Sequence, residues 1–466
     1  MSSSARLKKD FTEGPIFFKI TLFVLPIMLR GILQICYGMA DNIVVGRFSS
    51  DPTALAAVGT TGSLINLMIA LLMGIAGGVG IVISQLYGAK NFNPLSRAVH
   101  TAMVFSVIGG VVFSIGGLAA ARGALEIMEV KEELLEGATL YVRIRAVGFL
   151  ASAVYNFGAS ILGAAGDSKT PLLILASTGL VNVILNVVFV ICLGMTVDGV
   201  ATATVISEYL SAVIVVIVLM KRKSEPYAFS LKKLCFDTPQ FMRMLKIGIP
   251  AGVQSALFGI ANTTLISAVN TFPTSTVTAY TIAGNIDGIS YTTMNSFSQA
   301  AATFTGQNYG ARNYERVKKS FLYSLLQVTV VGVLICQLLL LTSHFVMGLY
   351  IDPSATDKDA IVTACDKILK VMLNTYVFCG IMEVLSGTLR GFGNAFAPML
   401  VNLLCTCGFR LLWANFVFPL DRFNSIIGLM LVYPLSWTIT YVPYAPLLVR
   451  TFKRFKSETK ADGVGE

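Results

Sequence analysis

The sequence predicts an all-α membrane protein in which twelve transmembrane helices form two pseudo-symmetric six-helix lobes. Three observations predict this fold. Of the 466 residues, 55% are hydrophobic and only 13% are charged, whereas soluble domains carry about 25% charged residues. Long apolar runs recur from one end of the chain to the other. Short motifs of the first half return in the second half.

Each apolar run is long enough to cross a membrane, because a hydrocarbon core of about 30 Å requires a helix of about 20 residues. An even number of spans places both termini on the same side. Residues 1–18 are polar and lack the apolar segment of a signal peptide, so we expect no cleaved leader. In chain order the twelve predicted spans are 19–46, 54–86, 99–121, 139–164, 171–194, 197–220, 244–270, 277–306, 320–350, 368–391, 396–420 and 424–449.

The basic residues predict the orientation. One set of alternate loops, together with both tails, holds 24 of the 35 Lys and Arg residues. The other loops and the helix ends beside them hold nine, including Arg143 and Arg145, and Arg30 and Arg410 lie inside spans. Since Lys and Arg accumulate on the cytoplasmic side, we expect a multi-pass membrane protein with both termini cytoplasmic. The net charge of +10 then reflects topology and not nucleic-acid binding.

Residues that commonly carry catalysis are sparse. The eight cysteines are dispersed, no Cys-x-x-Cys pair occurs, and the chain has two histidines. We interpret the cysteines as packing residues and expect no disulfide, metal centre or cofactor. No His-Glu-x-x-His, Gly-x-Ser-x-Gly or Gly-x-x-x-x-Gly-Lys-Ser/Thr motif is present. An intramembrane enzyme or an ATP-driven pump is therefore not expected, and a receptor would lack a sensory domain outside the membrane.

Three pairs of motifs divide the chain into two halves, and the second member of each pair follows the first by 222 to 227 residues. Parallel repeats of this kind are typical of transporters, with the substrate bound between the halves. We expect an amino-terminal lobe over 1–220, a basic cytoplasmic linker over 221–243, and a carboxyl-terminal lobe with a basic tail over 244–466. The pairs are SQLYGAKNFNPLSRAV (84–99) with GQNYGARNYERVKKS (306–320), LPIMLRGILQ (25–34) with IPAGVQSALF (249–258), and LGAAGDSKTP (162–171) with LRGFGNAFAP (389–398).

These motifs, with the first span LPIMLRGILQICYGMADNIVVG, resemble the multidrug and toxic compound extrusion (MATE) family over essentially the whole chain, and its DinF-like prokaryotic branch in particular. The resemblance implies a V-shaped, two-lobed exporter of the bacterial cytoplasmic membrane, acting as a monomer. It would exchange H⁺ or Na⁺ for small cationic or amphiphilic organic compounds by alternating access. A lipid-linked oligosaccharide flippase of the same superfamily is the alternative. Such flippases often have a more basic lumen and extra helices, which this sequence does not show.

A polar stripe runs along the first span. Steps of four, three and four residues put its members on one face of a helix. A carboxylate in the bilayer centre costs about 2.5–3.5 kcal/mol on insertion scales, so it faces a cavity or a partner. The stripe therefore indicates a water-filled lumen. Its members are Arg30, Gln34, Tyr37 and Asp41.

Asp41 has polar neighbours at a similar depth in other spans. Asn182 and Asn186 share a face of the fifth span, and Thr204 lies about as deep in the sixth. Carboxylate, amide and hydroxyl oxygens suit a small hard cation, so these four residues form the predicted cation-coupling site. In the DinF-like branch an Asp occupies the place of Asn186. The single carboxylate leaves both H⁺ and Na⁺ open as the ion, and the only metal expected is Na⁺ at Asp41.

Other polar residues inside spans are predicted to face a cavity or one another. Glu208 follows Thr204 by one turn, and we expect it either to pair with Arg30 or to supply the missing second acid. In the carboxyl-terminal lobe, Gln254 and Cys379 stand where the NorM-like branch carries acids, so that second coupling site looks absent. Glu383, Asp287 and Arg410 are expected to form a buried network or to line the cavity.

Overall fold

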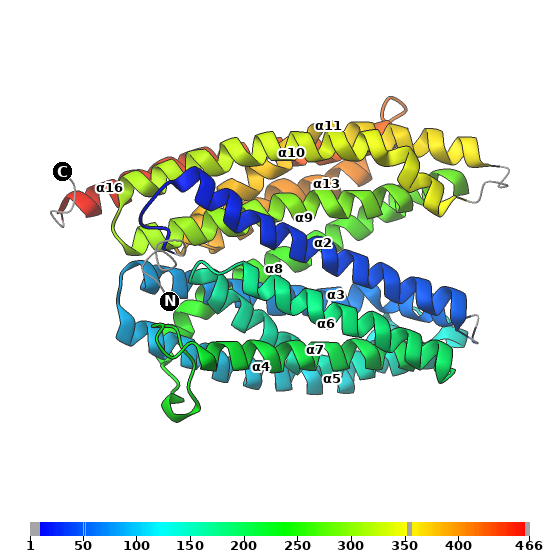
Figure 1. Cartoon of the computed structure of the whole chain (residues 1–466). Coiled ribbons are helices and arrows are strands. Elements are labelled where there is room, and N and C mark those ends of the chain that lie inside the picture. The colour runs from blue at the N-terminus through cyan, green and yellow to red at the C-terminus, as the bar shows by residue number, and fades with distance from the viewer. Residues whose placement is uncertain (1–9, 50, 52, 352–356, 462–466) are drawn as a thin grey trace. The chain divides into compact units, whose positions relative to one another are not determined.

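The computed structural model describes residues 10–49, 51, 53–351 and 357–461, and that part of the chain is built from helices without a strand (Figure 1). The prediction of an all-α protein is confirmed. Residues 1–9 of the predicted amino-terminal lobe and residues 462–466 of the predicted basic tail lie outside the described residues.

Six long helices make up the first half, and their order follows the predicted spans. The fifth is prolonged by a π-helical turn, η1, that begins directly after Asn186. The helices are α2 (Ile16–Phe48), α3 (Ala54–Gly88), α4 (Phe92–Ile127), α5 (Glu132–Ala164), α6 (Lys169–Asn186) with η1 (Val187–Cys192), and α7 (Val197–Lys221).

The second half repeats this pattern after a short 3₁₀ turn in the linker, η2 (Leu231–Lys233). Its fifth and sixth spans are assembled from shorter α and π segments. The elements are α8 (Thr238–Val269), α9 (Thr274–Gly310), α10 (Tyr314–Tyr350), α11 (Lys358–Gly391), then α12 (Phe396–Asn402), η3 (Leu403–Gly408), α13 (Phe409–Leu412) and η4 (Trp413–Val417), and last α14 (Ile426–Met430), α15 (Val432–Ile439) and α16 (Tyr441–Ala461).

Within the described residues, eleven helical segments are both long and apolar enough to cross a membrane. The remaining predicted span, 277–306, is α9, which has 37 residues but is rich in Thr, Ser and Asn. Its length matches that of its neighbours α10 and α11, and it packs against both. Length and packing thus make α9 the twelfth helix of the fold.

Several helices continue beyond their apolar stretch. α10 begins six residues before the predicted start at 320, α11 begins ten before 368, and α16 ends twelve after 449. Hydropathy detects only the apolar part of a helix, whereas the backbone hydrogen bonds continue through the polar turns beyond it. The predicted span ends are therefore the ends of apolar stretches and not of helices.

The chain divides into two compact units, which we call the first and second unit. Of the described residues, the first unit holds 10–11 and Leu25–Ser255, and the second holds Thr12–Val24 and Ala256–461. The initial turns of α2 thus pack within the second unit, and those of α8 pack within the first.

Glycines bring α8 close to α3 in the first unit. Gly74 and Gly78 of α3 face Gly252 and Gly248 of α8, and a Cβ on Gly248 would lie 2.6 Å from the Cα of Ile75. Small residues allow helix backbones in membranes to approach closely. This contact explains why the start of α8 belongs to the first unit.

The linker packs against the ends of helices of the first unit. The Arg222 guanidinium donates to Asp167 and, at 2.9 Å, to the Tyr227 hydroxyl. Burial raises the pKa of Tyr227 to about 12, and the ring of Tyr87 from the YGAK motif lies against it. The linker is therefore an ordered part of the first unit.

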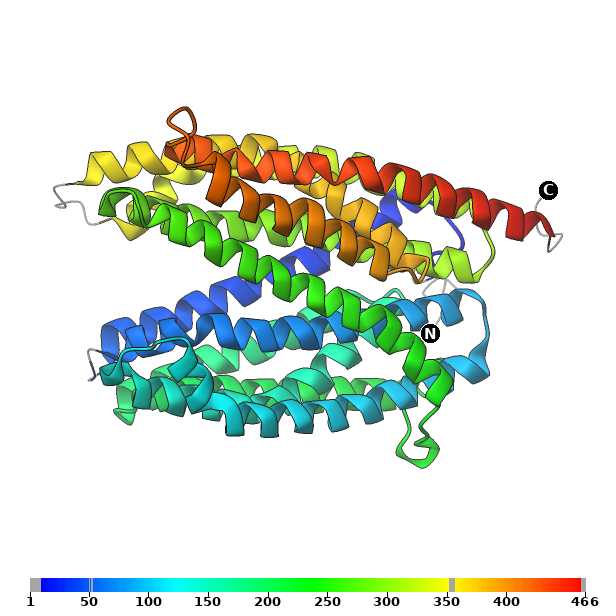
Figure 2. The same cartoon turned by 180° about the vertical axis from the view of Figure 1, so that it is seen from behind.

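The carboxyl-terminal helix makes the corresponding contact in the second unit. Phe455 of α16 is 1% exposed and packs on Tyr309 of the YGAR motif and on Phe392. Arg312 also pairs with Glu458 at 3.5 Å. Figure 2 shows α16 as the red helix that leads to the carboxyl terminus. In each unit, the segment after the sixth span thus packs on that unit's own repeat motif.

Candidate functional site

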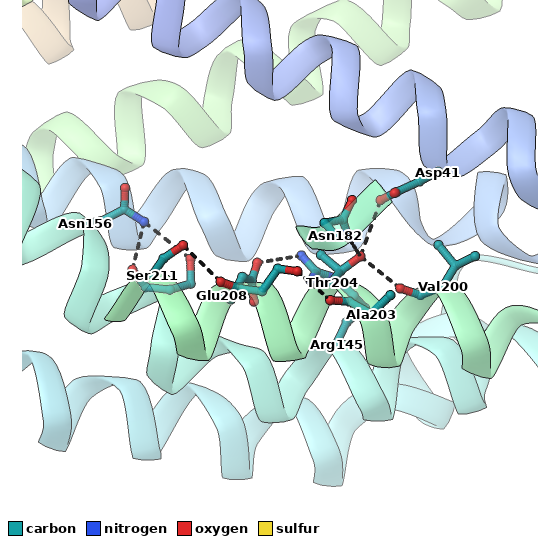
Figure 3. Close-up of polar contacts among 11 residues, drawn as sticks. Asp41, Arg145, Asn156, Asn182, Val200, Ala203, Thr204, Glu208 and Ser211 are labelled. Carbon is teal, nitrogen blue, oxygen red and sulfur yellow. Dashed lines mark hydrogen bonds and ion pairs between the residues drawn. The ribbon is translucent and has the colours of Figure 1, made fainter. Parts of the chain in front are cut away.

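Asp41 lies inside the first unit, on the last turns of α2. Its Oδ1 accepts a hydrogen bond of 2.5 Å from the amide nitrogen of Asn186 on α6. Its Oδ2 accepts one of 3.3 Å from the hydroxyl of Thr204 on α7 (Figure 3). Three helices thus meet at one carboxylate.

The two asparagines complete this cluster. The Asn186 amide nitrogen also lies 3.4 Å from Oδ1 of Asn182, and the Asn182 amide nitrogen donates to the Thr204 hydroxyl at 3.3 Å. Asn186 is fully buried, and its Oδ1 has no hydrogen-bond partner among the described residues. A buried acceptor without a donor loses free energy, so the cluster has an oxygen available for a cation.

Local structure explains how these side chains converge. Asn182 and Asn186 are four residues apart on α6 and share a face, and the π turn begins at the next residue. Single π turns inside α-helices occur frequently at functional sites. The structure therefore brings together all four residues of the predicted coupling site, Asp41, Asn182, Asn186 and Thr204, although their role in transport remains a prediction.

Tyr37 holds α2 against α6 one turn before Asp41. Its hydroxyl donates to the carbonyl of Ala176 at 3.2 Å, and its ring lies directly on Gly179. A Cβ at position 179 would overlap that ring. The rest of the predicted stripe has other surroundings: Gln34 is exposed, and Arg30 interacts with Tyr155, whose hydroxyl donates to the Pro171 carbonyl.

Glu208 pairs with Arg145, so the first of its two predicted alternatives, a pair with Arg30, is wrong. The second alternative, that Glu208 supplies the missing acid, stays a prediction. Arg145 Nη2 donates to Glu208 Oε1 at 3.1 Å (Figure 3). Arg145 is in the middle of α5, which packs along α7 as well as α3 and α4. Only 7% of Arg145 is exposed. The sequence assigned this arginine to an outer helix end, and that assignment is also wrong.

Residue spacing carries a weak signal for this burial. Arg143 and Arg145 are two residues apart, which on a helix directs them to different sides. Arg143 is exposed and Arg145 is buried. Without knowledge of which face of α5 meets α7, the sequence could not tell which arginine enters the interior.

The second unit contains a different polar network. Arg410 Nη1 donates to Asn262 at 2.7 Å, and its guanidinium lies 4.5 Å from the centre of the Tyr433 ring. The Tyr433 hydroxyl lies 3.1 Å from that of Tyr280. Asp287 interacts with Arg410 and Tyr376. Asp287 and Arg410 thus belong to one network rich in tyrosine.

Cys379 connects that network with Glu383, because its thiol interacts with both Asp287 and Glu383. Glu383 is buried and forms an ion pair of 3.9 Å with Arg390, and its carbonyl accepts from Ser298. Gln254 is buried on α8, in the part that packs with the first unit, and Cys379 is buried on α11. Neither Gln254 nor Cys379 has a carboxylate side chain that could bind a coupling ion.

The repeat places no oxygen-bearing side chain at the positions of the second half that correspond to Asp41 and Asn186. The motif offset of 224 residues aligns Asp41 with Leu265, and the offset of 227 aligns Asn186 with Trp413. An apolar side chain and an indole offer no oxygen to a cation. No group of three His, Cys, Asp or Glu side chains suited to a metal occurs among the described residues either.

Comparisons with known proteins agree with this architecture. The MatE family model matches residues 26–188 and 250–414, one segment in each half. The probable multidrug resistance protein YoeA of Bacillus subtilis is 26% identical over 440 residues, which cover 92% of each chain. The probable multidrug resistance protein NorM of Thermotoga maritima is 23% identical over 82% of this chain and 81% of the relative.

Solved structures show the same fold. An outward-facing multidrug resistance MATE family transporter of the MOP superfamily has a TM-score of 0.87 at 21% identity, covering 98% of this chain and 99% of that one. A MOP superfamily transporter from Pyrococcus furiosus has a TM-score of 0.86 at 22% identity, with coverages of 97% and 99%.

Proposed function

The chain belongs to the MatE family of membrane transporters, and from this premise we propose that it exports small organic compounds in exchange for an inward-moving monovalent cation, H⁺ or Na⁺. It is a multi-pass membrane protein and not an enzyme. Relatives that share up to 92% of its length are named multidrug resistance proteins, which supports cationic or amphiphilic organic substrates. We propose that the monomer is the working unit.

The observation that carries the proposal is the oxygen cluster around Asp41. A carboxylate, two amides and a hydroxyl converge there from three helices, and Asn186 Oδ1 is buried without a partner among the described residues. Oxygen ligands of this kind suit Na⁺. A proton would bind to the Asp41 carboxylate itself.

Coupling requires that the ion bind one conformation better than another. Asp41 is on α2, whereas its partners are on α6 and α7. Na⁺ bound between Asp41 and the neighbouring neutral oxygens would tighten the contacts between α2 and those helices. A proton on Asp41 would instead weaken the two hydrogen bonds that the ion-free carboxylate accepts. Either ion therefore changes how α2 packs on α6 and α7. In this mechanism, cation entry from outside favours substrate release and return to the inward-facing state.

Reconstitution tests the proposal. Purified protein in liposomes is given a proton gradient or a sodium gradient separately, and transport of the cationic dye ethidium is followed. We expect one of the two gradients to drive transport in the native protein and Asp41→Asn to abolish this response. The control is Glu133→Gln, which removes a carboxylate that is 68% exposed at the start of α5 and should transport like the native protein. Dye movement that ignores both gradients and the Asp41 substitution would overturn the proposal.

A further inference from the structure

Glu208 and Arg145 lie one turn beyond the coupling cluster. Glu208 follows Thr204 by four residues on α7, so the two side chains share a face. The Arg145 charge interacts with both Glu208 and Asp41. The region around Asp41 thus combines two carboxylates and one guanidinium.

This ion pair is incompletely satisfied. Arg145 Nη1 and Glu208 Oε2 are both buried and have no hydrogen-bond partner among the described residues. A buried ion pair stabilises a fold only when its remaining donors and acceptors are also satisfied. The pair is therefore poorly explained as a structural salt bridge, and it leaves an acceptor and a donor inside the unit.

The fold reserves space for the Glu208 carboxylate. Position 148 on α5 is glycine, and a Cβ there would overlap Glu208 Oε2 and lie 3.1 Å from Val205 Cγ2. The glycine thus lets the carboxylate lie between α5 and α7 beside Arg145. A side chain at position 148 would displace the Glu208 carboxylate from this place.

The groups that face the pair define its charge. Tyr141 of α5 is buried nearby and interacts with all three charged groups. α6 presents the neutral amides of Asn182 and Asn186 to this region. Arg30 of α2 is engaged with Tyr155. The charges at the site are therefore those of Asp41, Glu208 and Arg145.

We propose, on the basis of the cation-coupled export proposed above, that Arg145 sets the number of ions exchanged per cycle. Two carboxylates and one guanidinium leave a single net negative charge, and one monovalent cation balances it. The guanidinium of Arg145, which is fixed to α5, takes the place of a second mobile cation. The amide at position 186 fits this count, because an acid there would add another negative charge.

The test is the stoichiometry in proteoliposomes with ethidium, a monovalent cation. Exchange of one ion for one dye molecule moves no net charge, so native transport is expected to ignore an imposed membrane potential. The native transport rate should depend on the concentration of the driving ion with a Hill coefficient of about 1. The transport rate of Arg145→Gln should show a Hill coefficient that approaches about 2, because the number of ion sites limits this coefficient. Arg145→Gln transport should also respond to the potential.

Two further variants control the result. Arg145→Gln/Glu208→Gln removes one charge of each sign and should restore the coefficient of about 1. Arg122→Gln, at a 62% exposed side chain of α4, should behave like the native protein. If Arg145→Gln does not purify in folded form, Asn186→Asp adds a negative charge while retaining the pair, and it should give the same second-ion dependence and sensitivity to potential.

The outcomes separate the two proposals. A folded Arg145→Gln or Asn186→Asp protein with native ion dependence and no response to potential would overturn the role of Arg145, while gradient-driven transport that depends on Asp41 would leave the export proposal intact. Native protein that responds to neither gradient would overturn the export proposal itself, and this inference with it.

Discussion

Gly179→Ala tests whether the contact between α2 and α6 holds Asp41 in place. An added Cβ would overlap the Tyr37 ring, and even the ring's Cδ2 would lie only 2.6 Å away. Since carbon atoms need about 3.5 Å and the ring's Cε2 would lie 1.9 Å from the added Cβ, the ring and this part of α2 must move by about 1.6 Å. The Asp41–Thr204 hydrogen bond is already 3.3 Å long, so a shift of this size breaks it.

The magnitude follows from that bond. A hydrogen bond to a charged group contributes about 1.5–3 kcal/mol, and every 1.4 kcal/mol is about a factor of ten in affinity. If the driving ion is Na⁺, loss of the Thr204 oxygen from the site should raise its half-saturating concentration about tenfold or more. If the driving ion is H⁺, loss of a hydrogen bond that stabilises the ion-free carboxylate should lower the half-saturating proton concentration by a similar factor. The assay is the initial rate of dye transport in proteoliposomes as a function of ion concentration.

Gly38→Ala is the matched control, because position 38 is next to Tyr37 on α2 and no heavy atom lies within 4 Å of its Cβ position. Alanine favours a helix over glycine by about 1 kcal/mol, so this variant should be at least as stable as the native protein and transport normally. Replacing Tyr37 by Leu in the Gly179→Ala background should recover ion affinity. Native ion affinity in Gly179→Ala would show that the contact between Tyr37 and Gly179 does not position Asp41.

The remaining predictions concern the ends of the helices. Phe455→Ala removes a side chain that is 1% exposed and should lower stability by about 3 kcal/mol, measured by thermal unfolding in detergent, whereas Lys453→Ala, at an exposed position, should not. Asp167→Ala removes the partner of Arg222 and the acceptor for the Thr170 backbone N–H, and it should increase proteolysis of the linker; unchanged cleavage would contradict the docking. Because the pKa of Tyr227 is about 12 in the fold and about 10 when exposed, the folded state keeps a proton that the unfolded state loses. Stability should therefore fall as pH rises from about 10 to about 12, less steeply in Tyr227→Phe.

Much of the fold could be predicted because hydropathy and the repeats are local properties of the sequence. The helix ends were harder to predict from the sequence. For example, α16 continues as a polar helix to Ala461, and buried aromatic residues such as Phe455 stabilise that extension. α9 has the weakest hydropathy signal of the spans, and its place in the fold depends on packing against α11.

The sequence predicted how deep in the membrane the site residues lie, but not which face of α5 is turned toward α7. A rise of 1.5 Å per residue puts Asp41, Asn186 and Thr204 at a similar level, and the structure brings them into contact. The partner of Glu208 was not predictable, because it depends on which face of α5 meets α7. Arg145 is buried there, and no spacing on α2 or α7 reports it.

We propose that the ion exchanged for substrate binds at Asp41. The most direct test of this claim is ion release from purified protein in weakly buffered detergent solution, followed with a pH indicator and, separately, with radioactive sodium, when ethidium is added. We predict that ethidium displaces one of the two ions from the native protein and from Glu133→Gln, but neither ion from Asp41→Asn. Equal release from Asp41→Asn and the native protein would contradict the claim.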